Sequence, residues 1–587
     1  MHANLRSFLS QLRKENELVE IAAPVDPYLE IAEIHRRVIA EGGPALLFTN
    51  VKNSAFPVVT NLFGTYRRVE MAVGKRPETI VRQAVEALDR LFPPKPASLW
   101  RERGWIREIA FKTGLRTVSS RRAPVLEAGM EKPDMTKLPA LTTWPEDGGP
   151  FVTLPLVYTE HPVSRAHNLG MYRMQIFSPD LTGMHWQIHK GGGFHHYEAE
   201  LRNESLPVTV FLGGPPALIL SAIAPVPEML PELILASFMM GGKLNRTTVS
   251  GHPHPLIAEA EFAFCGEVPP HVRKQEGPFG DHYGYYSLAH DFPVFRVKRV
   301  YHRKDAIYPA TIVGKPRQED YYIAEYLVNL LSPVFPVVMP GVKELWAYPE
   351  SGAHALASAR VRESYYREAV AHGFRILGEG QLTLTKFLIL TDAPCDLRNF
   401  AQLMETVAAR FQPHRDLLII DDTSMDTLDY TGRAFNKGSK GILAGVGEPV
   451  REPKRVYDGG PIPGIGKIRP YCGGCLVVSG ASFAADEELA ARLVKSGREQ
   501  LKDWQFVFLV DDADEIRDQM SFIWTVFTRF NPAHDVYAEA EIKYNKIRYR
   551  GPIIVDCRMK PWYPATVEPR EDTVKLVDER WKEYFMG

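Results

Sequence analysis

Two stretches in the last third of the chain repeat one another without a gap, and this repeat constrains the fold more than any other feature. Residues 387–416, FLILTDAPCDLRNFAQLMETVAARFQPHRD, align with residues 506–535, FVFLVDDADEIRDQMSFIWTVFTRFNPAHD. Each stretch reads as a strand, an acidic turn, a helix and an exit of the form R-F-x-P-x-x-D. Two copies are too few for a solenoid, so we expect a duplicated α/β subdomain. Neither copy carries a local catalytic motif, so we expect the duplication to serve packing or assembly.

The rest of the chain changes texture along its length, which predicts a multidomain protein of α/β and α+β class. A length of 587 residues predicts two to four domains. The expected regions are an N-terminal α/β domain, a mostly antiparallel β domain that is barrel-like if it closes, a C-terminal α/β domain, and the second copy with its tail. Their boundaries are expected at residues 1–118, 119–318, 319–450 and 451–587. In the β domain the expected strands include residues 206–214, 217–226 and 292–303.

Composition narrows the class of partner and the compartment. A formal net charge of −1 argues against nucleic acid, because phosphate backbones require a positive excess. Five cysteines suit a reducing cytosol better than a disulfide framework. The N-terminus is an amphipathic helix without the apolar run of a signal peptide. The apolar run 326–340 is short and contains three prolines, so we expect no transmembrane segment and a cytoplasmic protein.

The most unusual composition lies in residues 168–196, NLGMYRMQIFSPDLTGMHWQIHKGGGFHH. Residues 171–176 alternate in polarity and predict a strand with one polar face, and SPDLTG after it is typical of a turn. HWQIHKGGG then leads imidazoles into glycines that can approach an anion closely. The alternative is a polar hairpin at a sheet edge. Lys190 with the glycines lacks the Walker spacing, and His185 with His189 lacks a nearby acidic or cysteine partner for zinc.

A second motif, EGPFGDHYGYY at residues 276–286, places two acids around a Gly-Pro-Phe-Gly turn. Such a turn can direct Glu276 and Asp281 into one pocket, where neighbouring carboxylates raise one pKa and create a general acid. Arg173 offers a complementary charge for a substrate carboxylate or for this pair. The alternative is a surface turn with solvated acids.

Oxygen donors elsewhere suggest a hard metal ion. Asn168 and Glu232 provide an amide and a carboxylate oxygen, which together with phosphate oxygens favour Mg²⁺ or Mn²⁺. Taken singly, Glu232 also fits the first turn of a helix, where a carboxylate favours the dipole. The pair Cys472 and Cys475 has no second CxxC, so we interpret it as a glycine-rich loop with incidental cysteines.

Taken together, these motifs resemble those of the UbiD-type decarboxylases. NLGMYR, GMHWQIHKGG, the P-x-P-x-x-L-P-E that ends at Glu232, EGPFGDHYGYY and the TKF at residues 385–387 occur in the order and spacing of that family. The resemblance covers roughly residues 5–446. It implies reversible, non-oxidative decarboxylation of an aromatic or α,β-unsaturated acid with prenylated FMN. Loss of CO₂ from an sp² carbon requires such a cofactor as an electron sink.

The resemblance also implies roles for individual residues. Arg173, Glu276 and Asp281 form the acid–base network, with Asp281 as the proton donor and Glu276 tuning Arg173. Asn168 and Glu232 match metal ligands that bridge the cofactor phosphate, with His189 as the third ligand, although Lys190 is the alternative at that place. The positions that match cofactor contacts are Met171, Tyr172, Arg173, His185, Trp186, Gln187, Lys190 and Gly191, with Lys386 reaching the phosphate from the C-terminal domain. In some relatives a potassium ion accompanies the site.

The fold implied by the resemblance is an N-terminal α/β domain, a central split β-barrel that binds the flavin, and a C-terminal α/β domain used in dimerisation. A homodimer or higher homo-oligomer and a flavin prenyltransferase as cofactor supplier follow. The expected substrate is a quinone-pathway acid, for ubiquinone or menaquinone, and a prenylated substrate would bring the protein to the membrane periphery. The alternatives are a catabolic phenolic-acid decarboxylase or carboxylase, and a non-catalytic prenyl-FMN-binding partner. The chain departs from the family in having a second C-terminal copy.

Overall fold

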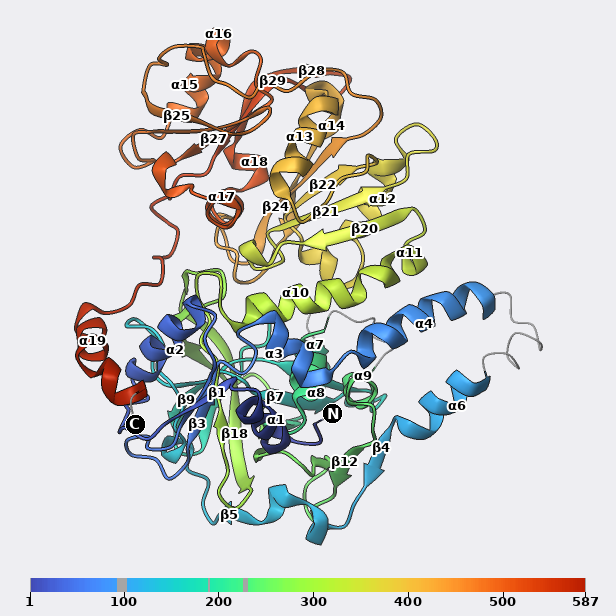
Figure 1. Cartoon of the computed structure of the whole chain (residues 1–587), viewed down its shortest axis with the longest axis vertical. Helices are drawn as coiled ribbons and strands as arrows, with labels where there is room; N and C mark the ends of the chain where they lie inside the picture. The colour runs from blue at the N-terminus through green and yellow to red at the C-terminus, as the bar shows by residue number, and fades with distance from the viewer. Residues whose placement is uncertain (1, 92–102, 188–190, 225–230, 586–587) are drawn as a thin grey trace. The chain divides into compact units, whose positions relative to one another are not determined.

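The computed structural model describes residues 2–91, 103–187, 191–224 and 231–585 (Figure 1). The chain forms two compact units, and each is described on its own. Unit 1 consists of Met1–Leu330 with Ala565–Gly587, and unit 2 consists of Leu331–Pro564. The mixed multidomain fold expected from the sequence is confirmed.

The N-terminal part of unit 1 is an α/β layer. Asn4 caps helix α1 (Leu5–Lys14), which buries Leu5, Phe8, Leu9 and Leu12 at helical spacing. Strands β1 (Leu18–Ile21), β2 (Ala45–Phe48), β3 (Val58–Thr60) and β19 (Tyr308–Pro309) form one sheet in that order. The helices of this part are α2 (Glu30–Ala40), α3 (Tyr66–Val73), α4 (Arg76–Leu91) and α6 (Arg103–Lys112). Strand β19 follows the central sheet in the chain, so the two layers share a connection.

The core of unit 1 is a curled ten-stranded sheet, and its strand pairings among the described residues are all antiparallel. The order is β6-β9-β10-β18-β14-β11-β7-β8, with β15 and β5 also on β18. The strands are β5 (Ala128–Met130), β6 (Phe151–Val152), β7 (Leu156–Glu160), β8 (His167–Met171), β9 (Met174–Ser178), β10 (Leu181–Gly183), β11 (Leu206–Leu212), β14 (Phe262–Val268), β15 (Arg273–Glu276) and β18 (His290–His302). This is the mostly antiparallel β domain that the strand texture predicted, and its curled half-barrel form agrees with the split barrel that the resemblance implied.

Smaller elements surround this sheet. Strands β13 (Leu256–Ile257), β12 (Leu244–Thr247) and β4 (Leu115–Thr117) form a second sheet, and β16 (Phe279–Gly280) pairs with β17 (Tyr286–Ser287). The helices are α7 (Gly191–Leu201), α8 (Pro216–Ile223), α9 (Glu232–Met240) and α10 (Glu319–Leu331), with 3₁₀ turns η1 (Ser120–Arg122), η2 (Pro124–Leu126) and η3 (Met135–Lys137).

Two local predictions in this region were wrong. Residues 217–226 were expected to be a strand, but α8 covers most of them. A short, fully apolar run has no periodicity that separates a buried helix from a buried strand. The expected strand over residues 171–176 is broken, because Tyr172 and Arg173 lie between β8 and β9. The glycines from Gly191 onward, for which the sequence predicted no element, begin helix α7.

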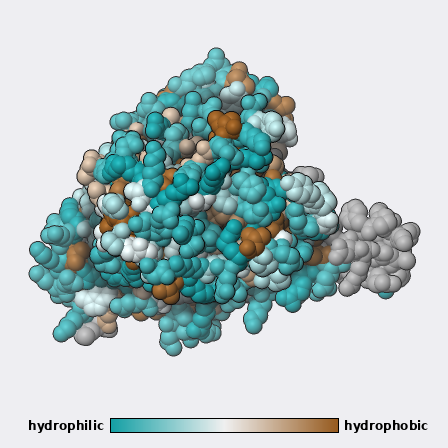
Figure 2. Space-filling model, turned by 90° about the horizontal axis from the view of Figure 1, so that it is seen from above, coloured by the Kyte–Doolittle hydropathy of each residue, from teal (hydrophilic) through white to brown (hydrophobic). Residues whose placement is uncertain are grey.

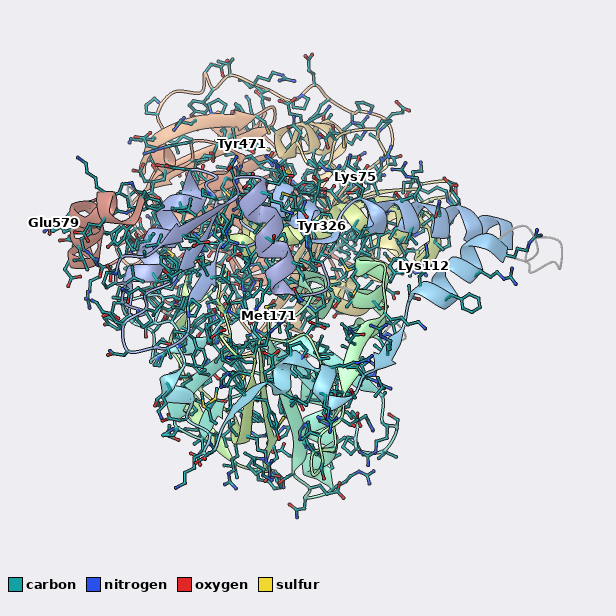
Figure 3. The ribbon with its side chains drawn as sticks, turned by 60° about the horizontal axis from the view of Figure 1, so that its bottom comes forward. Lys75, Lys112, Met171, Tyr326, Tyr471 and Glu579 are labelled. Atoms are coloured by element: carbon teal, nitrogen blue, oxygen red, sulfur yellow. The ribbon has the colours of Figure 1, made fainter. Side chains whose placement is uncertain are left out.

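The C-terminal tail of unit 1 packs on the N-terminal layer. Helix α19 (Glu571–Phe585) contacts α2 through Tyr584, whose hydroxyl donates a hydrogen bond of 2.6 Å to Glu30 Oε1. Arg580 Nη2 donates to the carbonyl of Pro24 at 2.9 Å. Glu579 points outward from this helix, whereas Met171 lies within the body of unit 1 (Figure 3). The tail that the sequence analysis expected after the second copy therefore belongs to unit 1.

Unit 2 confirms the duplication. The first copy (residues 342–445) has a five-stranded sheet of order β20-β21-β22-β24-β23, and the second copy (residues 465–556) has β25-β26-β27-β29-β28. In both copies the two outer pairings are antiparallel and the two inner pairings are parallel. The two sheets therefore share one topology.

The bounds of the first copy and the segment before it are η4 (Ser332–Val334), α11 (Phe335–Val338), β20 (Val342–Ala347), η5 (Pro349–Ser351), β21 (Leu356–Val361), α12 (Glu368–Leu377), η6 (Gly380–Leu384), β22 (Phe387–Thr391), α13 (Phe400–Arg410), α14 (Pro413–Asp416), β23 (Leu417–Ser424) and β24 (Lys437–Gly445). Those of the second copy are β25 (Ile465–Cys472), β26 (Cys475–Gly480), α15 (Leu489–Ser496), α16 (Arg498–Leu501), β27 (Phe506–Val510), η7 (Ala513–Glu515), α17 (Gln519–Phe527), α18 (Pro532–Asp535), β28 (Val536–Lys543) and β29 (Lys546–Asp556).

The repeated R-F-x-P-x-x-D exit has a structural role. Its proline begins helix α14 in the first copy and α18 in the second, a position at which the missing N–H costs nothing. Its aspartate accepts a hydrogen bond from the backbone N–H four residues earlier, at 2.9 Å for Asp416 and 2.6 Å for Asp535. The motif therefore fixes a sharp helix-to-strand turn.

The face shown in Figure 2 is mostly hydrophilic, with small separate apolar patches. Among the described residues, one helical run, Glu319–Val338, is long and apolar enough by length and composition to cross a membrane. It is divided into α10, η4 and α11, and core helices of soluble proteins pass the same test.

Candidate active site

Arg173 is the centre of a buried charge cluster in unit 1. It lies in the break between β8 and β9, and only 9% of its surface is exposed. Its Nε donates to Glu276 Oε1 at 3.2 Å, its Nη1 donates to Asp281 Oδ2, and its Nη2 donates to Ser287 Oγ at 2.9 Å. The guanidinium also stands over the Phe279 ring, 4.7 Å from its centre. The three residues predicted to form an acid–base network are therefore in contact.

Glu276 ends strand β15 and is completely buried. Its Oε1 also accepts a hydrogen bond from His185 Nδ1 at 2.9 Å. Its Oε2 has no hydrogen-bond partner among the described residues. This oxygen lies against Gly183, where an added Cβ would stand only 2.3 Å from it. The Glu276 carboxylate can therefore occupy this position because residue 183 has no Cβ.

The two carboxylate oxygens of Asp281 have different hydrogen-bond partners. Oδ2 contacts Arg173, whereas Oδ1 accepts from the backbone N–H of His282 at 2.7 Å and from its Nδ1 at 2.8 Å. Burial acts to raise the pKa of Asp281, but the charge of Arg173 and the contacts with His282 outweigh it and hold that pKa well below its usual range. Asp281 is thus a carboxylate at neutral pH in this arrangement.

The histidine beside Glu276 is neutral. Burial, followed by the nearby charge of Arg173, lowers the pKa of His185 despite the opposing effect of Glu276. Its ring packs against Phe292, with centres 4.2 Å apart. A neutral imidazole that donates from Nδ1 fixes the orientation of the Glu276 carboxylate without adding a charge to the cluster.

Three residues without an assigned role in the sequence hold the turn of residues 276–281. Gln175 Oε1 accepts from Gly277 N at 2.9 Å, Asp147 Oδ1 accepts from Gly280 N at 2.8 Å, and Ser287 Oγ accepts from Phe279 N at 3.2 Å. Gln175 lies two residues after Arg173 on the same face of the alternating pattern, so the sequence could have indicated it. Asp147 and Ser287 carried none, because their contacts form only in the tertiary structure.

Tyr172 and Trp186, two of the predicted cofactor-binding residues, lie close to the glycines at the start of α7 in unit 1. The Tyr172 hydroxyl accepts from Asn168 Nδ2 at 3.3 Å and from Gly192 N at 3.4 Å. Trp186 is buried, and its Nε1 has no partner among the described residues. An added Cβ at Gly191 would stand 2.2 Å from Asn168 Oδ1, so the chain passes this amide closely. A buried donor beside a glycine cradle fits a bound polar cofactor.

The predicted metal ligands Asn168 and Glu232 lie close together. Glu232 begins α9, and its Oε2 accepts from the N–H of Leu169 at 3.2 Å, next to Asn168. Burial raises the pKa of the Glu232 carboxyl because it disfavours the ionised form, and a bound cation would stabilise that form. Two adjacent oxygen donors fit a hard divalent ion. The described residues contain no group of three or more His, Cys, Asp or Glu side chains placed for a metal, and His189 and Lys190 lie outside them.

The other predicted residues are less directly placed. Gln187 Nε2 lies 3.5 Å from His185 Nε2, and Met171 packs beside the unit 1 core. In unit 2, Lys386 is buried and pairs with Asp429 at 2.8 Å. Its ammonium is therefore already neutralised within unit 2.

The remaining histidines of the 168–196 stretch have structural contacts. His195 Nδ1 lies 2.9 Å from Thr159 Oγ1, and His196 packs on Trp186 with ring centres 5.0 Å apart. Burial is the main cause that lowers the pKa of both to about 4. Both imidazoles are thus neutral, and His196 forms part of the wall around Trp186.

Models of known protein families match most of this chain. Three models of 3-octaprenyl-4-hydroxybenzoate carboxy-lyase match in order: the N-terminal domain at residues 9–88, the Rift-related domain at 116–316 and the C-terminal domain at 321–445. These matches define the chain as a carboxy-lyase. The charge cluster and the Asn168–Glu232 pair fall in the central match, and the second copy lies outside all three. The chain belongs to the UbiD family.

Individual relatives extend over the whole chain or show the fold. A Chlamydia pneumoniae protein, named as one of the subunits of a 4-hydroxybenzoate decarboxylase, is 49% identical over 585 residues, 99% of this chain and 98% of its own. An uncharacterised Chlamydia trachomatis protein is 50% identical over 587 residues, 99% of this chain and 100% of its own. The vanillic acid decarboxylase of Sedimentibacter hydroxybenzoicus, in closed form, is 23% identical with a TM-score of 0.68, covering 78% of this chain and 94% of its own. HmfF of Pelotomaculum thermopropionicum, solved with prFMN, is 24% identical with a TM-score of 0.62, covering 79% and 98%.

Proposed function

We propose that this protein catalyses the reversible, non-oxidative decarboxylation of an aromatic or α,β-unsaturated carboxylic acid with prenylated FMN. The observation that carries the proposal is the buried cluster in which Arg173 binds both Glu276 and Asp281. Such a cluster combines a cation for a carboxylate with an acid for a proton, which are the two functions that exchange of CO₂ for a proton requires. Family membership supports the same reaction.

The cofactor residues would be Met171, Tyr172, Arg173, His185, Trp186, Gln187, Lys190 and Gly191. When bound, prenylated FMN supplies the electron sink for the carbanion that remains after CO₂ leaves. Asn168 and Glu232, with His189, would hold a divalent Mn²⁺ or Mg²⁺ ion beside the cofactor phosphate, and a potassium ion would complete the site. Trp186 Nε1 is a buried donor with no hydrogen-bond partner among the described residues, which supports placing the cofactor beside it.

Arg173 would bind the substrate carboxylate and thereby control Asp281. Its guanidinium now lowers the pKa of Asp281, which keeps that group ionised. A substrate carboxylate that takes a share of the same guanidinium weakens this effect, and burial then raises the pKa of Asp281. Asp281 becomes able to hold a proton and deliver it to the substrate carbon after CO₂ is lost. Glu276 keeps Arg173 in place during the exchange.

His282 would renew that proton. Its Nδ1 contacts Asp281 Oδ1, and its side chain is 24% exposed against 11% for Asp281. Each decarboxylation consumes one proton, so the buried acid needs a link toward solvent. An imidazole that gives its Nδ1 proton to Asp281 and regains one at Nε2 provides that link.

The proposed substrate is an acid of quinone biosynthesis, a polyprenyl-4-hydroxybenzoate or a dihydroxynaphthoate. The family description and the chlamydial relative named for 4-hydroxybenzoate support the first. The second candidate is a catabolic phenolic-acid decarboxylase or carboxylase, which the solved relatives acting on vanillic and 3,4-dihydroxybenzoic acids favour. A non-catalytic prenyl-FMN-binding partner is the third, and retention of all three residues of the charge cluster argues against it.

We further propose a cytoplasmic homodimer or higher oligomer that receives its cofactor from a flavin prenyltransferase and reaches the membrane periphery if its substrate is prenylated. The domain boundaries proposed are residues 1–118, 119–318, 319–450 and 451–587. Among the solved relatives, a form of HmfF is described as dimeric, which supports self-association.

The test is a panel of aromatic acids presented to protein co-expressed with a flavin prenyltransferase. The panel contains 4-hydroxybenzoate, its polyprenyl derivative, dihydroxynaphthoate, vanillate and 3,4-dihydroxybenzoate. We expect a modified-flavin absorbance spectrum, CO₂ release and solvent-deuterium exchange at the position of the lost carboxylate. A protein that carries the modified flavin but neither releases CO₂ nor exchanges deuterium with the whole panel would contradict the proposal and favour the non-catalytic partner.

A further inference from the structure

The two C-terminal copies in unit 2 pack against each other, and they do so with equivalent residues. Phe387 begins β22 and contacts Phe530, with ring centres 5.5 Å apart. Phe506, the equivalent of Phe387 in the second copy, begins β27 and contacts Phe411, the equivalent of Phe530, at 4.9 Å. All four rings are buried. One aromatic contact thus occurs twice, with the roles of the copies exchanged.

The helices repeat the same exchange. In the first copy, Glu405 on α13 accepts a hydrogen bond of 2.8 Å from Gly473 N, in the turn between the first two strands of the second copy. In the second copy, Gln519 on α17 donates 3.1 Å to Glu350, in the turn between the first two strands of the first copy. Gln519 also accepts 2.9 Å from the N–H of Phe400, the residue at its own equivalent position. A contact between equivalent positions lies at the axis of a two-fold arrangement.

A contact in which surface i meets j and j meets i is the geometry of an isologous dimer. It normally forms between two identical chains, each of which presents the same self-complementary patch. Here the short helices and paired strands follow the same rule, because α14 contacts β29 and α18 contacts β24. The two copies also lie side by side in unit 2 (Figure 1). Unit 2 is therefore built as a dimer within one chain.

The turn between Cys472 and Cys475 gains a role in this arrangement. These residues are cross-strand partners in the hairpin of β25 and β26, joined by two glycines. An added Cβ at Gly473 would stand 3.3 Å from Cγ of Glu405. The glycines allow α13 of the other copy to approach the backbone closely.

We propose that the second copy is a built-in partner: it covers, within one chain, the face through which a single copy would pair with the same face of another chain. This face is defined by Phe387, Phe411, Glu405 and the turn at residues 349–351. The family model for the C-terminal domain matches the first copy and ends at residue 445, so the second copy lies beyond that match. Because the face is covered, any dimer of the full chain uses a different surface. This inference does not depend on the proposed reaction.

The test introduces a disulfide across this face in the full-length protein. In a Cys472→Ser background, Glu405→Cys and Gly473→Cys place a sulfur near the present Cγ of Glu405, 3.3 Å from the new Cβ, which suits a disulfide. We expect a disulfide within one chain, found by peptide mapping, with the mass of a single chain on a non-reducing gel. The matched control replaces Gly473→Cys by Gly466→Cys, whose position on β25 has only Ser479 of its own copy nearby, and should give no link.

The locked protein then decides whether the face is closed to other chains. We expect its sedimentation mass to equal that of the unlocked protein at all concentrations, because the lock changes no surface used between chains. Linked dimers as the main product would show that copies pair between chains and would overturn the proposal. A sedimentation mass that falls on locking would do the same, and failure of the pair to link would refute the contact itself.

Discussion

The sharpest prediction concerns Gly183, a residue that carries no chemistry. In Gly183→Ala the new methyl would stand 2.3 Å from Glu276 Oε2. An ordinary van der Waals contact between carbon and oxygen is about 1 Å longer than this distance. Position 183 does not have a positive φ, so alanine is acceptable to the backbone itself. The carboxylate of Glu276 must therefore turn or shift. Its Oε1 holds Arg173 and His185, so these contacts lengthen.

The magnitude follows from the contact that is lost. A hydrogen bond to a charged group contributes about 1.5–3 kcal/mol, which corresponds to about a 10- to 150-fold change in rate if the contact is needed in the transition state. We expect kcat for deuterium exchange to fall by that factor while the flavin spectrum and the folded state persist. The adverse packing itself costs about 1–3 kcal/mol of stability.

Rescue distinguishes this reasoning from general damage. Glu276→Asp shortens the side chain by one methylene and removes the overlap, so adding it to Gly183→Ala should cost less than the sum of the two single effects. The assay is kcat of the two single variants and the double variant, with Gly466→Ala as a remote control. If Gly183→Ala exchanges deuterium at the unmodified rate, or if the two effects simply add, the packing of Glu276 against Gly183 does not control Arg173.

Three further predictions concern the charges around this site. Asp281→Asn should retain the modified flavin but lose about 100- to 10,000-fold in CO₂ release, since it keeps the shape and removes the acid; normal turnover would remove Asp281 from the mechanism. Burial raises the pKa of Asp320, which faces His282 and Asp281, to about 6. An unfolded aspartate ionises near ~4, so the folded state loses stability as pH rises from about 4 through 6. Asp320→Asn should therefore raise the free energy of unfolding more at pH 8 than at pH 4, by on the order of 1–3 kcal/mol, and an equal rise at both pH values would contradict the burial. Glu232→Gln should weaken stabilisation by Mn²⁺ at least about tenfold in thermal melts, and an unchanged metal response would place the ion elsewhere.

Local sequence patterns predicted much of the scaffold. The spacing of Leu5, Phe8, Leu9 and Leu12 predicted the buried face of α1, because a 3.6-residue period admits few alternatives. The repeat predicted two α/β subdomains, and both sheets have the same topology. The run 217–226 failed for a physical reason: every side chain is buried or apolar there, so periodicity carries no signal, and packing made it helix α8.

The candidate site was predictable only in part. Arg173, Glu276 and Asp281 stood out by residue type and by their turn, and the structure brings them together. Their supports, Asp147 and Ser287, did not stand out, because a backbone N–H can be held by any nearby acceptor, and which acceptor is nearby depends on the fold. The expected strand over residues 171–176 also broke at the residue that matters most, since Arg173 turns out of the ladder to reach the two acids.

The sequence by itself determined the residue types of the charge cluster, the alternation of its strands and the presence of two copies, because these are properties of neighbours along the chain. Only the tertiary structure decided the ionised state of Asp281, the space that Gly183 leaves for Glu276, and the reciprocal contact of Phe387 with Phe530 and Phe506 with Phe411. Those depend on burial and on distances between residues far apart in sequence. A pKa, a close approach and a two-fold contact exist only once the chain has folded.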